Sequence, residues 1–353
     1  MGKQNRESNI ELLRIFAMLG VVILHYNNAT IGKGFAYVAQ GSLNHSILLG
    51  LEGLFICAVN LFILITGYFS ISSQKRSPTK AVALLLQVIA FRVAQYLISN
   101  LDEGITLTGL LTRMLPINYF VILYIAVYLL SPYLNLLLKK LSSPQRTRLV
   151  VLTLCLCSFW PTLIDIMQDI TGANYMGLST ISAYGSDWGY TLVNFLLMYL
   201  LGAWLRLENI ALKKRFSGSI LLICAGALAF LGTVLTPDVA WSYCNPLVIL
   251  EAVAAFLLFR QLHFSSKIIN VLSRGAFTCF LLHTIFLGKA GIPAAVQGSA
   301  ATMICHVLIT PIVIYLACFV AYLVYDFISK PVLKLIDRLF QKIKLDFSVE
   351  ETS

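Results

Sequence analysis

The sequence predicts an all-α polytopic membrane protein with about ten transmembrane helices and both ends in the cytoplasm. The 353-residue chain is 58% hydrophobic and only 12% charged, and its mean hydropathy is +0.82. Soluble domains are nearer 45–50% apolar and about 25% charged, so this composition excludes a soluble protein. Two further observations support the prediction. The apolar residues occur in membrane-spanning runs, and the basic residues gather in alternate connections between these runs.

Each apolar run accounts for one predicted helix. A helix needs about 20 predominantly apolar residues to cross the hydrocarbon core of a bilayer, with about 17 as the lower limit. Because the number of runs is even, a chain that crosses once per run has both ends on one side. The ten runs cover residues 9–29, 46–69, 80–100, 115–138, 149–166, 190–206, 217–236, 246–262, 270–288 and 300–325.

The basic residues orient the chain. One set of alternate connections, together with both ends, carries 21 Lys and Arg residues, whereas the opposite set carries only Lys33, Arg113 and Lys289. Cytoplasmic connections are the ones enriched in Lys and Arg, so both termini are predicted to be cytoplasmic. This bias accounts for most of the net charge of +10, and no nucleic-acid partner is expected.

The predicted domain boundary follows residue 328. No connection is long enough to form a separate soluble domain, so residues 1–328 are predicted to be one membrane domain. Residues 329–353 alternate apolar and basic side chains, which predicts an amphipathic tail on the inner membrane surface, in contact with lipids. The eight cysteines show no paired ligand spacing, so neither a disulfide framework nor a metal site is expected.

Arg14 and His25 are the leading candidate site residues. Both lie in the first apolar run, and eleven positions of an α-helix make about three turns. The two side chains therefore share one face, roughly 16 Å apart along the axis. Ionisable groups inside a bilayer are costly, which makes each of them a functional-site candidate.

Five ionisable side chains are predicted to lie at one depth, roughly 6–9 Å below the outer surface. They come from five different helices and suggest a single polar chamber that opens outward. Each also has a structural interpretation, as a hydrogen-bonding link between helices, which is favoured for Glu251 and His306 and balanced for His283. Arg92, in mid-span, needs an internal partner, for which the glutamates are candidates. The five side chains are His25, Glu52, Glu251, His283 and His306.

Two further groups have two interpretations each. Lys75, Arg76 and Lys80 follow the second run and either anchor anionic lipid or hold the phosphates of an anionic cytosolic donor. The outer connections are rich in aromatic residues, which form either an interfacial belt or a sugar-binding rim. These aromatic residues include Tyr175, Tyr184, Trp188, Trp241 and Tyr243.

The chain resembles the acyltransferase-3 family of bacterial membrane acyltransferases. The segment Asn9–His25, with ten residues between its Arg and its His, is similar to the family signature. Asn60–Phe69, Asn118–Pro132, Met198–Arg206 and Phe280–His283 resemble further family segments, in the same order along the chain. The sequence departs from the family at Thr66, where Ser is usual, at Tyr119, where Trp is common, and after the second run. An Arg-x-x-Arg pair is often found there, and Lys75, Arg76 and Lys80 stand in its place.

The resemblance implies transfer of an acyl group, most often acetyl, from cytosolic acyl-CoA to a hydroxyl outside the bacterial cytoplasmic membrane. The acceptor would be a cell-surface polysaccharide or its lipid-linked precursor. Arg14 with Lys75, Arg76 and Lys80 would hold the CoA phosphates, and no metal is implied.

In this reading His25 would act as general base and Glu52 would orient its ring, with a covalent acyl-His25 relay as an alternative mechanism. The family also includes the membrane half of certain serine racemases, for which transport is proposed. The competing function is therefore a transporter or flippase for a small polar solute or lipid-linked sugar.

Overall fold

The protein is helical throughout the part described by the computed structural model, which covers residues 6–73, 76–101, 104–343 and 347. Within these ranges the chain forms helices and connections but no β-strand, apart from one isolated bridge between Ser182 and Gly185. Eight of the helical segments are long and apolar enough to cross a membrane. The predicted class, an all-α polytopic membrane protein, is confirmed, whereas the number of crossings and the side on which the ends lie stay predictions.

Each predicted run coincides with one helix or with consecutive helices. In chain order the elements are α1 (Ser8–Asn27), α2 (Gly34–Tyr37), α3 (Leu43–Phe55), α4 (Ala58–Ser70), α5 (Pro78–Ser99), α6 (Leu107–Arg113), α7 (Tyr119–Lys140), α8 (Ser143–Leu154), η1 (Cys155–Phe159), α9 (Trp160–Thr171), η2 (Asp187–Gly189), α10 (Leu192–Leu207), α11 (Lys214–Val234), α12 (Pro237–Ala240), α13 (Pro246–Arg260), α14 (Lys267–Leu272), η3 (Ser273–Gly275), α15 (Ala276–Leu287), α16 (Ile292–Gln297) and α17 (Ala300–Lys342).

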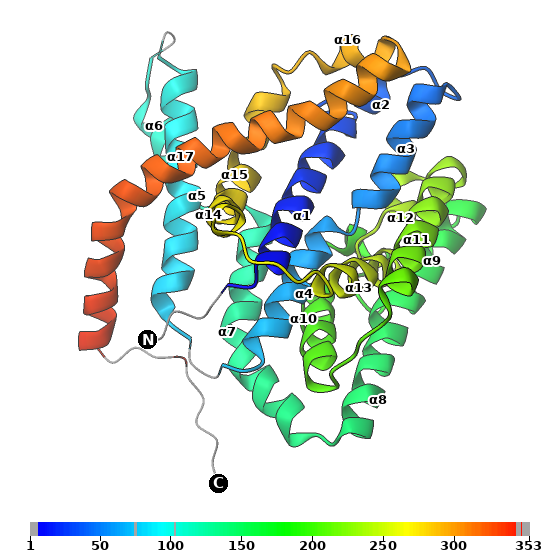
Figure 1. The fold of residues 1–353 in the computed structure, drawn as a ribbon, viewed down its shortest axis with the longest axis horizontal. Coiled ribbons are helices and arrows are strands. Elements are labelled where there is room, and N and C mark those ends of the chain that lie inside the picture. The colour runs from blue at the N-terminus through cyan, green and yellow to red at the C-terminus, as the bar shows by residue number, and fades with distance from the viewer. Residues whose placement is uncertain (1–5, 74–75, 102–103, 344–346, 348–353) are drawn as a thin grey trace.

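Helix α1 lies near the middle of the molecule (Figure 1) and contacts α3, α4, α13, α14, α15 and α17. Its side chains are buried over most of its circumference, which is the environment expected of a helix that is apolar on all faces. The long α17 packs against α15 and η3 and also contacts α5. The residues that α1 carries are therefore surrounded by other helices.

Helix α10 is shorter than a full membrane span but packs closely against α4. A Cβ atom added at Gly67 would collide with the backbone of Tyr199, and one added at Gly202 would collide with the backbone of Leu64. Small residues at such contacts let two helices approach closely inside a membrane. The α4–α10 pair therefore forms a rigid wall beside α1.

Three predicted spans are interrupted in ways that the pattern of apolar residues did not predict, and in the run 270–288 the turn η3 joins α14 to α15. The run 46–69 forms α3 and α4, which are separated at Ile56 and Cys57, where no Gly or Pro marks a break. The run 149–166 lies within a longer helical segment and contains the π-helical turn η1 just before Pro161. Proline lacks an N–H and collides with the carbonyl four residues earlier, and a π-turn accommodates both defects.

The last predicted span and the predicted tail are parts of one helix. Helix α17 runs from Ala300 to Lys342 and contains Pro311 and Pro331. It bends near its C-terminal end (Figure 1), as expected where a proline removes a helical hydrogen bond. The tail is tied to α5 by a hydrogen bond of 2.7 Å that the Thr79 hydroxyl donates to Asp337 Oδ1. Residues 344–346 and 348–353 of the tail lie outside the described residues.

The predicted orientation can be tested with single cysteines in a background from which the eight native cysteines have been removed. Met176 and Lys213 are both exposed and lie in connections of opposite predicted sidedness. A membrane-impermeant maleimide should label the Met176→Cys variant in intact cells but not the Lys213→Cys variant, and it should label both after permeabilisation. Labelling of Lys213→Cys in intact cells would reverse the predicted orientation.

Candidate active site

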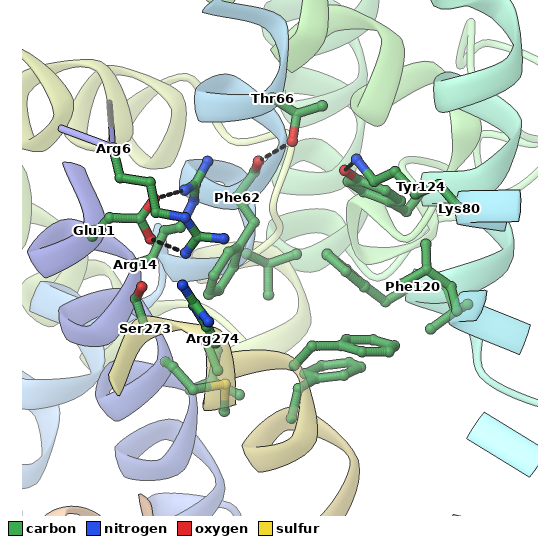
Figure 2. Close-up of a pocket in the computed structure, with 18 residues that line it drawn as sticks. Arg6, Glu11, Arg14, Phe62, Thr66, Lys80, Phe120, Tyr124, Ser273 and Arg274 are labelled. Carbon is green, nitrogen blue, oxygen red and sulfur yellow. Dashed lines mark hydrogen bonds and ion pairs between the residues drawn. The ribbon is translucent and has the colours of Figure 1, made fainter. Parts of the chain in front are cut away.

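A cavity of about 370 Å³ opens beside the N-terminal half of α1, and we call it the basic cavity. Its entrance carries four cations and one carboxylate, whereas its deeper wall is apolar and includes Val21, Phe120 and Phe280. Figure 2 shows Arg6, Arg14 and Arg274 gathered around Glu11 on one side and Lys80 with Tyr124 on the other. The charged residues are Arg6, Glu11, Arg14, Lys80 and Arg274.

The carboxylate of Glu11 holds the cations of α1 in place. Its Oε1 lies 2.6 Å from Arg14 Nη1 and its Oε2 lies 3.6 Å from Arg6 Nη1, and the side chain of Glu11 is only 6% exposed. Glu11 and Arg14 are three positions apart, which places them on one face of the helix. Lys80 lies on the opposite side of the cavity and donates a hydrogen bond of 3.2 Å to the Tyr124 hydroxyl. One carboxylate against four cations leaves the entrance positively charged.

A second cavity, of about 470 Å³, lies at the opposite end of α1, and we call it the aromatic cavity. Phe35 and Trp241 stack at 5.8 Å between ring centroids on its wall.

Two ionisable residues of the aromatic cavity have shifted pKa values. Burial, together with the nearby carboxylate of Asp169, raises the pKa of Asp238, and burial raises the pKa of Tyr243 well above its usual range. The Tyr243 phenol therefore keeps its proton and can donate a hydrogen bond. The cavity is lined by Leu24, His25, Asn28, Ala29, Phe35, Gln40, His45, Leu49, Glu52, Ile56, Trp188, Tyr190, Gly232, Pro237, Asp238, Trp241 and Tyr243.

The backbone is strained at the mouth of the aromatic cavity. Asp187 and Trp188 have φ angles of 49° and 60°, in the left-handed region that side chains other than glycine rarely adopt. A hydrogen bond of 2.9 Å from the Tyr243 amide to the Trp188 carbonyl holds this turn, and the Trp188 side chain is 51% exposed. Strain of this kind is concentrated at binding and catalytic sites, where the surrounding structure maintains it.

His25 lies in the wall between the two cavities. It lines the aromatic cavity, whereas Val21, one helical turn earlier, lines the basic cavity, and the two cavities share no lining residue. His25 Nδ1 lies 2.9 Å from the Val21 carbonyl oxygen. A carbonyl oxygen only accepts hydrogen bonds, so Nδ1 carries the proton and Nε2 keeps a free lone pair. In the neutral imidazole, the basic nitrogen is therefore Nε2.

A second imidazole lies against the first. The ring centroids of His25 and His283 are 4.7 Å apart, with an edge-to-face angle of 73°. His283 is 2% exposed, its Nδ1 lies 2.9 Å from the Cys279 carbonyl oxygen, and its Nε2 has no hydrogen-bond partner among the described residues. Phe280, three residues before His283, lines the basic cavity. His283 therefore belongs to the same wall.

The structure does not gather the five predicted chamber residues into one cavity. Glu52 lines the aromatic cavity with His25, but its Oε2 accepts a hydrogen bond of 2.7 Å from Asn27 Nδ2. The Val21 carbonyl, and no described bond from Glu52, holds the ring at Nδ1, so the role of Glu52 in orienting His25 stays a prediction.

Glu251, His306 and Arg92 lie elsewhere and line neither the basic nor the aromatic cavity. His306 lies 2.9 Å from both the Tyr26 hydroxyl and the Ala290 carbonyl oxygen, so it links helices. Glu251 is fully buried on α13, and its side chain pairs with the thiol of Cys57, at the break between α3 and α4. Arg92 is bound to a backbone carbonyl, that of Ile117 at 3.4 Å, and to neither glutamate.

The predicted donor cluster is only partly assembled. Lys80 joins Arg14 in the basic cavity, but Arg76 does not line it. Arg76 is 4% exposed, donates a hydrogen bond of 2.7 Å to the Ser131 hydroxyl and stacks over the Tyr128 ring. Its guanidinium thus ties the segment after α4 to α7. Lys75 lies outside the described residues.

Three residues of the basic cavity were missed in the sequence. Glu11 lies three positions before Arg14, a spacing that places an acid and a base on one helix face, and this signal was available. Arg6 lies just before the apolar run and Arg274 lies in a short turn before α15, and both were counted only as orienting charges. Their approach to Arg14 depends on how α1 packs against η3.

The match to known families agrees with this geometry. The model of the acyltransferase-3 family, described as an acyltransferase domain, matches residues 7–326 of the chain. The chain belongs to this family. The match begins one residue before α1 and ends within α17, so it includes all residues that line the aromatic cavity and all but Arg6 of the basic cavity. No curated protein and no solved structure matches the chain.

Membership in the acyltransferase-3 family makes the protein a multi-pass membrane acyltransferase. Within the described ranges, no group of three or more His, Cys, Asp or Glu side chains is placed to hold a metal ion, and the lack of a metal stays a prediction.

The link between Asn27 and Glu52 should contribute measurably to stability. Asn27 is fully buried and bridges α1 to α3 through Glu52 and the Leu48 carbonyl. Because each partner satisfies the other, Asn27→Ala and Glu52→Ala should show a coupling free energy of about 0.5–3 kcal/mol in a double-mutant cycle. Reversible unfolding in mixed detergent micelles measures it, and strictly additive effects would show that the two side chains are not coupled.

Proposed function

We propose that this acyltransferase transfers an acetyl group from cytosolic acetyl-CoA to a hydroxyl of an acceptor outside the bacterial cytoplasmic membrane. The acceptor is a cell-surface polysaccharide or its lipid-linked precursor. One observation carries the proposal: His25, with a free Nε2, lies in a wall one helical turn thick between a basic cavity and an aromatic cavity. Such an arrangement lets two substrates of opposite character meet at one base from opposite sides.

The basic cavity suits the donor. Its excess of positive charge matches the phosphates of CoA, and Arg makes bidentate charge-assisted hydrogen bonds to phosphate. Arg14 is held by Glu11 with its side chain 33% exposed, so it remains accessible to a ligand. The apolar deep wall, at Phe120, Val121 and Phe280, suits the pantetheine arm and a short acyl group.

The aromatic cavity suits a sugar. Flat rings stack on the apolar faces of carbohydrates, and Phe35, Trp188 and Trp241 line this cavity. Glu52 and Asp238 supply oxygen acceptors for sugar hydroxyls, whereas Tyr243 supplies a donor. A few polar groups fix the orientation of a ligand in a cavity whose lining is mostly aromatic and apolar.

The reaction needs one proton acceptor. His25 Nε2 removes the hydroxyl proton as the oxygen attacks the thioester carbonyl, so that a C–O bond forms and the C–S bond breaks. The imidazolium then returns this proton to the departing thiolate, and the products are an ester and a free thiol. General-base catalysis of this kind contributes typically about 10²–10⁴-fold, and positioning of the two substrates supplies much of the remainder. In a relay through acyl-His25, the same lone pair would attack the thioester first.

His25→Ala should abolish acetyl transfer, because it removes the Nε2 lone pair. We expect at least about a 10²-fold loss of kcat, the lower bound for a general base, while the variant protein accumulates to normal levels. The measurement is transfer of radiolabelled acetyl groups to surface glycans in inverted membrane vesicles. His306→Gln is a matched control, since His306 lines neither cavity and Gln can replace both of its hydrogen bonds. Normal transfer by His25→Ala would refute the catalytic role.

Acetyl-CoA should stabilise the purified protein thermally, since a ligand that binds only the folded state at 100 times its Kd stabilises by about 2.7 kcal/mol. Arg14→Ala should remove most of the rise in Tm and Arg14→Lys should restore part of it, whereas His25→Ala should keep it. If acyl-CoAs leave the Tm unchanged and a free sugar or amino acid raises it, the transporter interpretation is correct instead.

A further inference from the structure

The basic cavity is one end of a longer trough. Two more cavities, distinct from the aromatic cavity, continue it. The second cavity of the trough, of about 480 Å³, shares Arg14 and Lys80 with the basic cavity. The third cavity of the trough, of about 430 Å³, shares Tyr68 and Arg206 with the second. Arg6 lines all three cavities. We call the three together the basic trough. It leads from the wall at Val21 past Arg14 to the end of α13.

The end of the trough away from Val21 holds two arginines on one buried aromatic ring. The guanidinium carbons of Arg206 and Arg260 lie 5.0 and 5.3 Å from the centroid of the Tyr68 ring. Arg206 Nη1 also donates a hydrogen bond of 3.1 Å to the Tyr68 hydroxyl. Tyr68 is 2% exposed and packs against the Phe256 ring at 4.8 Å, so it is a fixed support.

The positions of the two guanidinium groups are fixed before any ligand binds. Arg260 donates hydrogen bonds to the Ile210 carbonyl at 3.0 Å and to Asn209 Oδ1 at 3.2 Å. Arg206 lies at the last turn of α10 and Arg260 at the last turn of α13, so two helices present them to one point. A site whose cations are already ordered loses less entropy when it binds an anion.

Within the part of the chain that the structure describes, no carboxylate forms an ion pair with either of these arginines. The described ion pairs of the trough all involve Glu11, which binds Arg6 and Arg14. Glu7 is the acidic residue that lines the second and third cavities together, and no described ion pair joins it to Arg206 or Arg260. The positive charge of Arg206 and Arg260 is therefore available to bind an anionic ligand.

We propose that Arg206 and Arg260 bind the 3′-phosphate on the ribose of the donor, beyond the diphosphate that Arg14 binds, with Tyr68 as the positioning residue that holds both guanidinium groups. This inference rests on the proposed function, because it assumes an acyl-CoA donor. In CoA the nucleotide phosphates are separated from the thioester by the long pantetheine arm. The trough has the same order, with the two arginines lining its third cavity and the Val21–His25 wall beyond the basic cavity at its other end.

The experiment compares two donors that differ only in the nucleotide. Acetyl-CoA carries it, whereas acetyl-pantetheine lacks every phosphate. Arg206→Gln and Arg260→Gln should each raise the KM for acetyl-CoA about tenfold or more, as expected for loss of a hydrogen bond between charged groups, with kcat unchanged. The KM for acetyl-pantetheine should stay at the wild-type value, which also shows that the variants are folded.

Two further variants sharpen the comparison. Arg215→Gln is the matched control, because Arg215 lies in the first turn of α11, stacks on Phe216 and lines none of the three cavities, so both KM values should be unchanged. Tyr68→Phe keeps the ring and removes the hydroxyl, and it should raise the KM for acetyl-CoA alone by a smaller factor. Equal changes with both donors, or no change with either, would overturn the inference.

A binding measurement separates this inference from the proposed reaction. Adenosine 3′,5′-bisphosphate should bind the wild-type protein in neutral-lipid nanodiscs and should not bind the Arg206→Gln variant. Anionic phosphatidylglycerol in the nanodisc should leave its Kd unchanged, and displacement by this lipid would assign the arginines to a lipid headgroup and overturn the inference. If the wild type binds the bisphosphate but transfers acetyl from neither donor, the proposed function fails and the nucleotide site stands.

Discussion

The structure depends on one constraint: a polar atom on a helix inside a membrane must find its partner within the protein. Helix α1 carries several such atoms near its C-terminal end, and its neighbours supply most of their partners. Asn27 binds Glu52 of α3, and Tyr26 binds His306 of α17. His25 uses its own helix, through the Val21 carbonyl. These bonds fix the rotation of α1 about its axis, and that rotation decides which side chains face each cavity.

The fixed rotation separates two chemical environments along a single helix. Toward its N-terminus α1 presents Arg14 among cations, and toward its C-terminus it presents His25 among aromatic rings. The change occurs within the one turn from Val21 to His25. Because the Val21 carbonyl sets the tautomer of His25, the same turn both separates the cavities and prepares the base. His283 supports this turn from α15, through its contact with the His25 ring.

Composition and the positions of Lys and Arg predicted the class of the protein, and each apolar run forms one helix or consecutive helices. The separation of α3 from α4 could not be read from the sequence, since Ile56 and Cys57 carry no local signal for a break. The depth in the membrane was predicted for five side chains, but depth does not say which neighbouring helix or cavity a side chain faces. The five are His25, Glu52, Glu251, His283 and His306. Glu251 and His306 consequently face other helices. Arg76 likewise turns toward α7, because sequence neighbourhood does not fix which way a long side chain leaves its loop.

The separation of the two cavities has a consequence for the cell that houses this membrane. An enzyme that works across a bilayer risks becoming a leak for protons and other ions, which would dissipate the gradient that drives transport. Here the two cavities end on opposite sides of Val21 and His25 and share no lining residue. In the proposed reaction, each substrate stays on its own side and only a small acyl group passes the barrier. Turnover then needs no open passage, so the membrane can stay electrically sealed during catalysis.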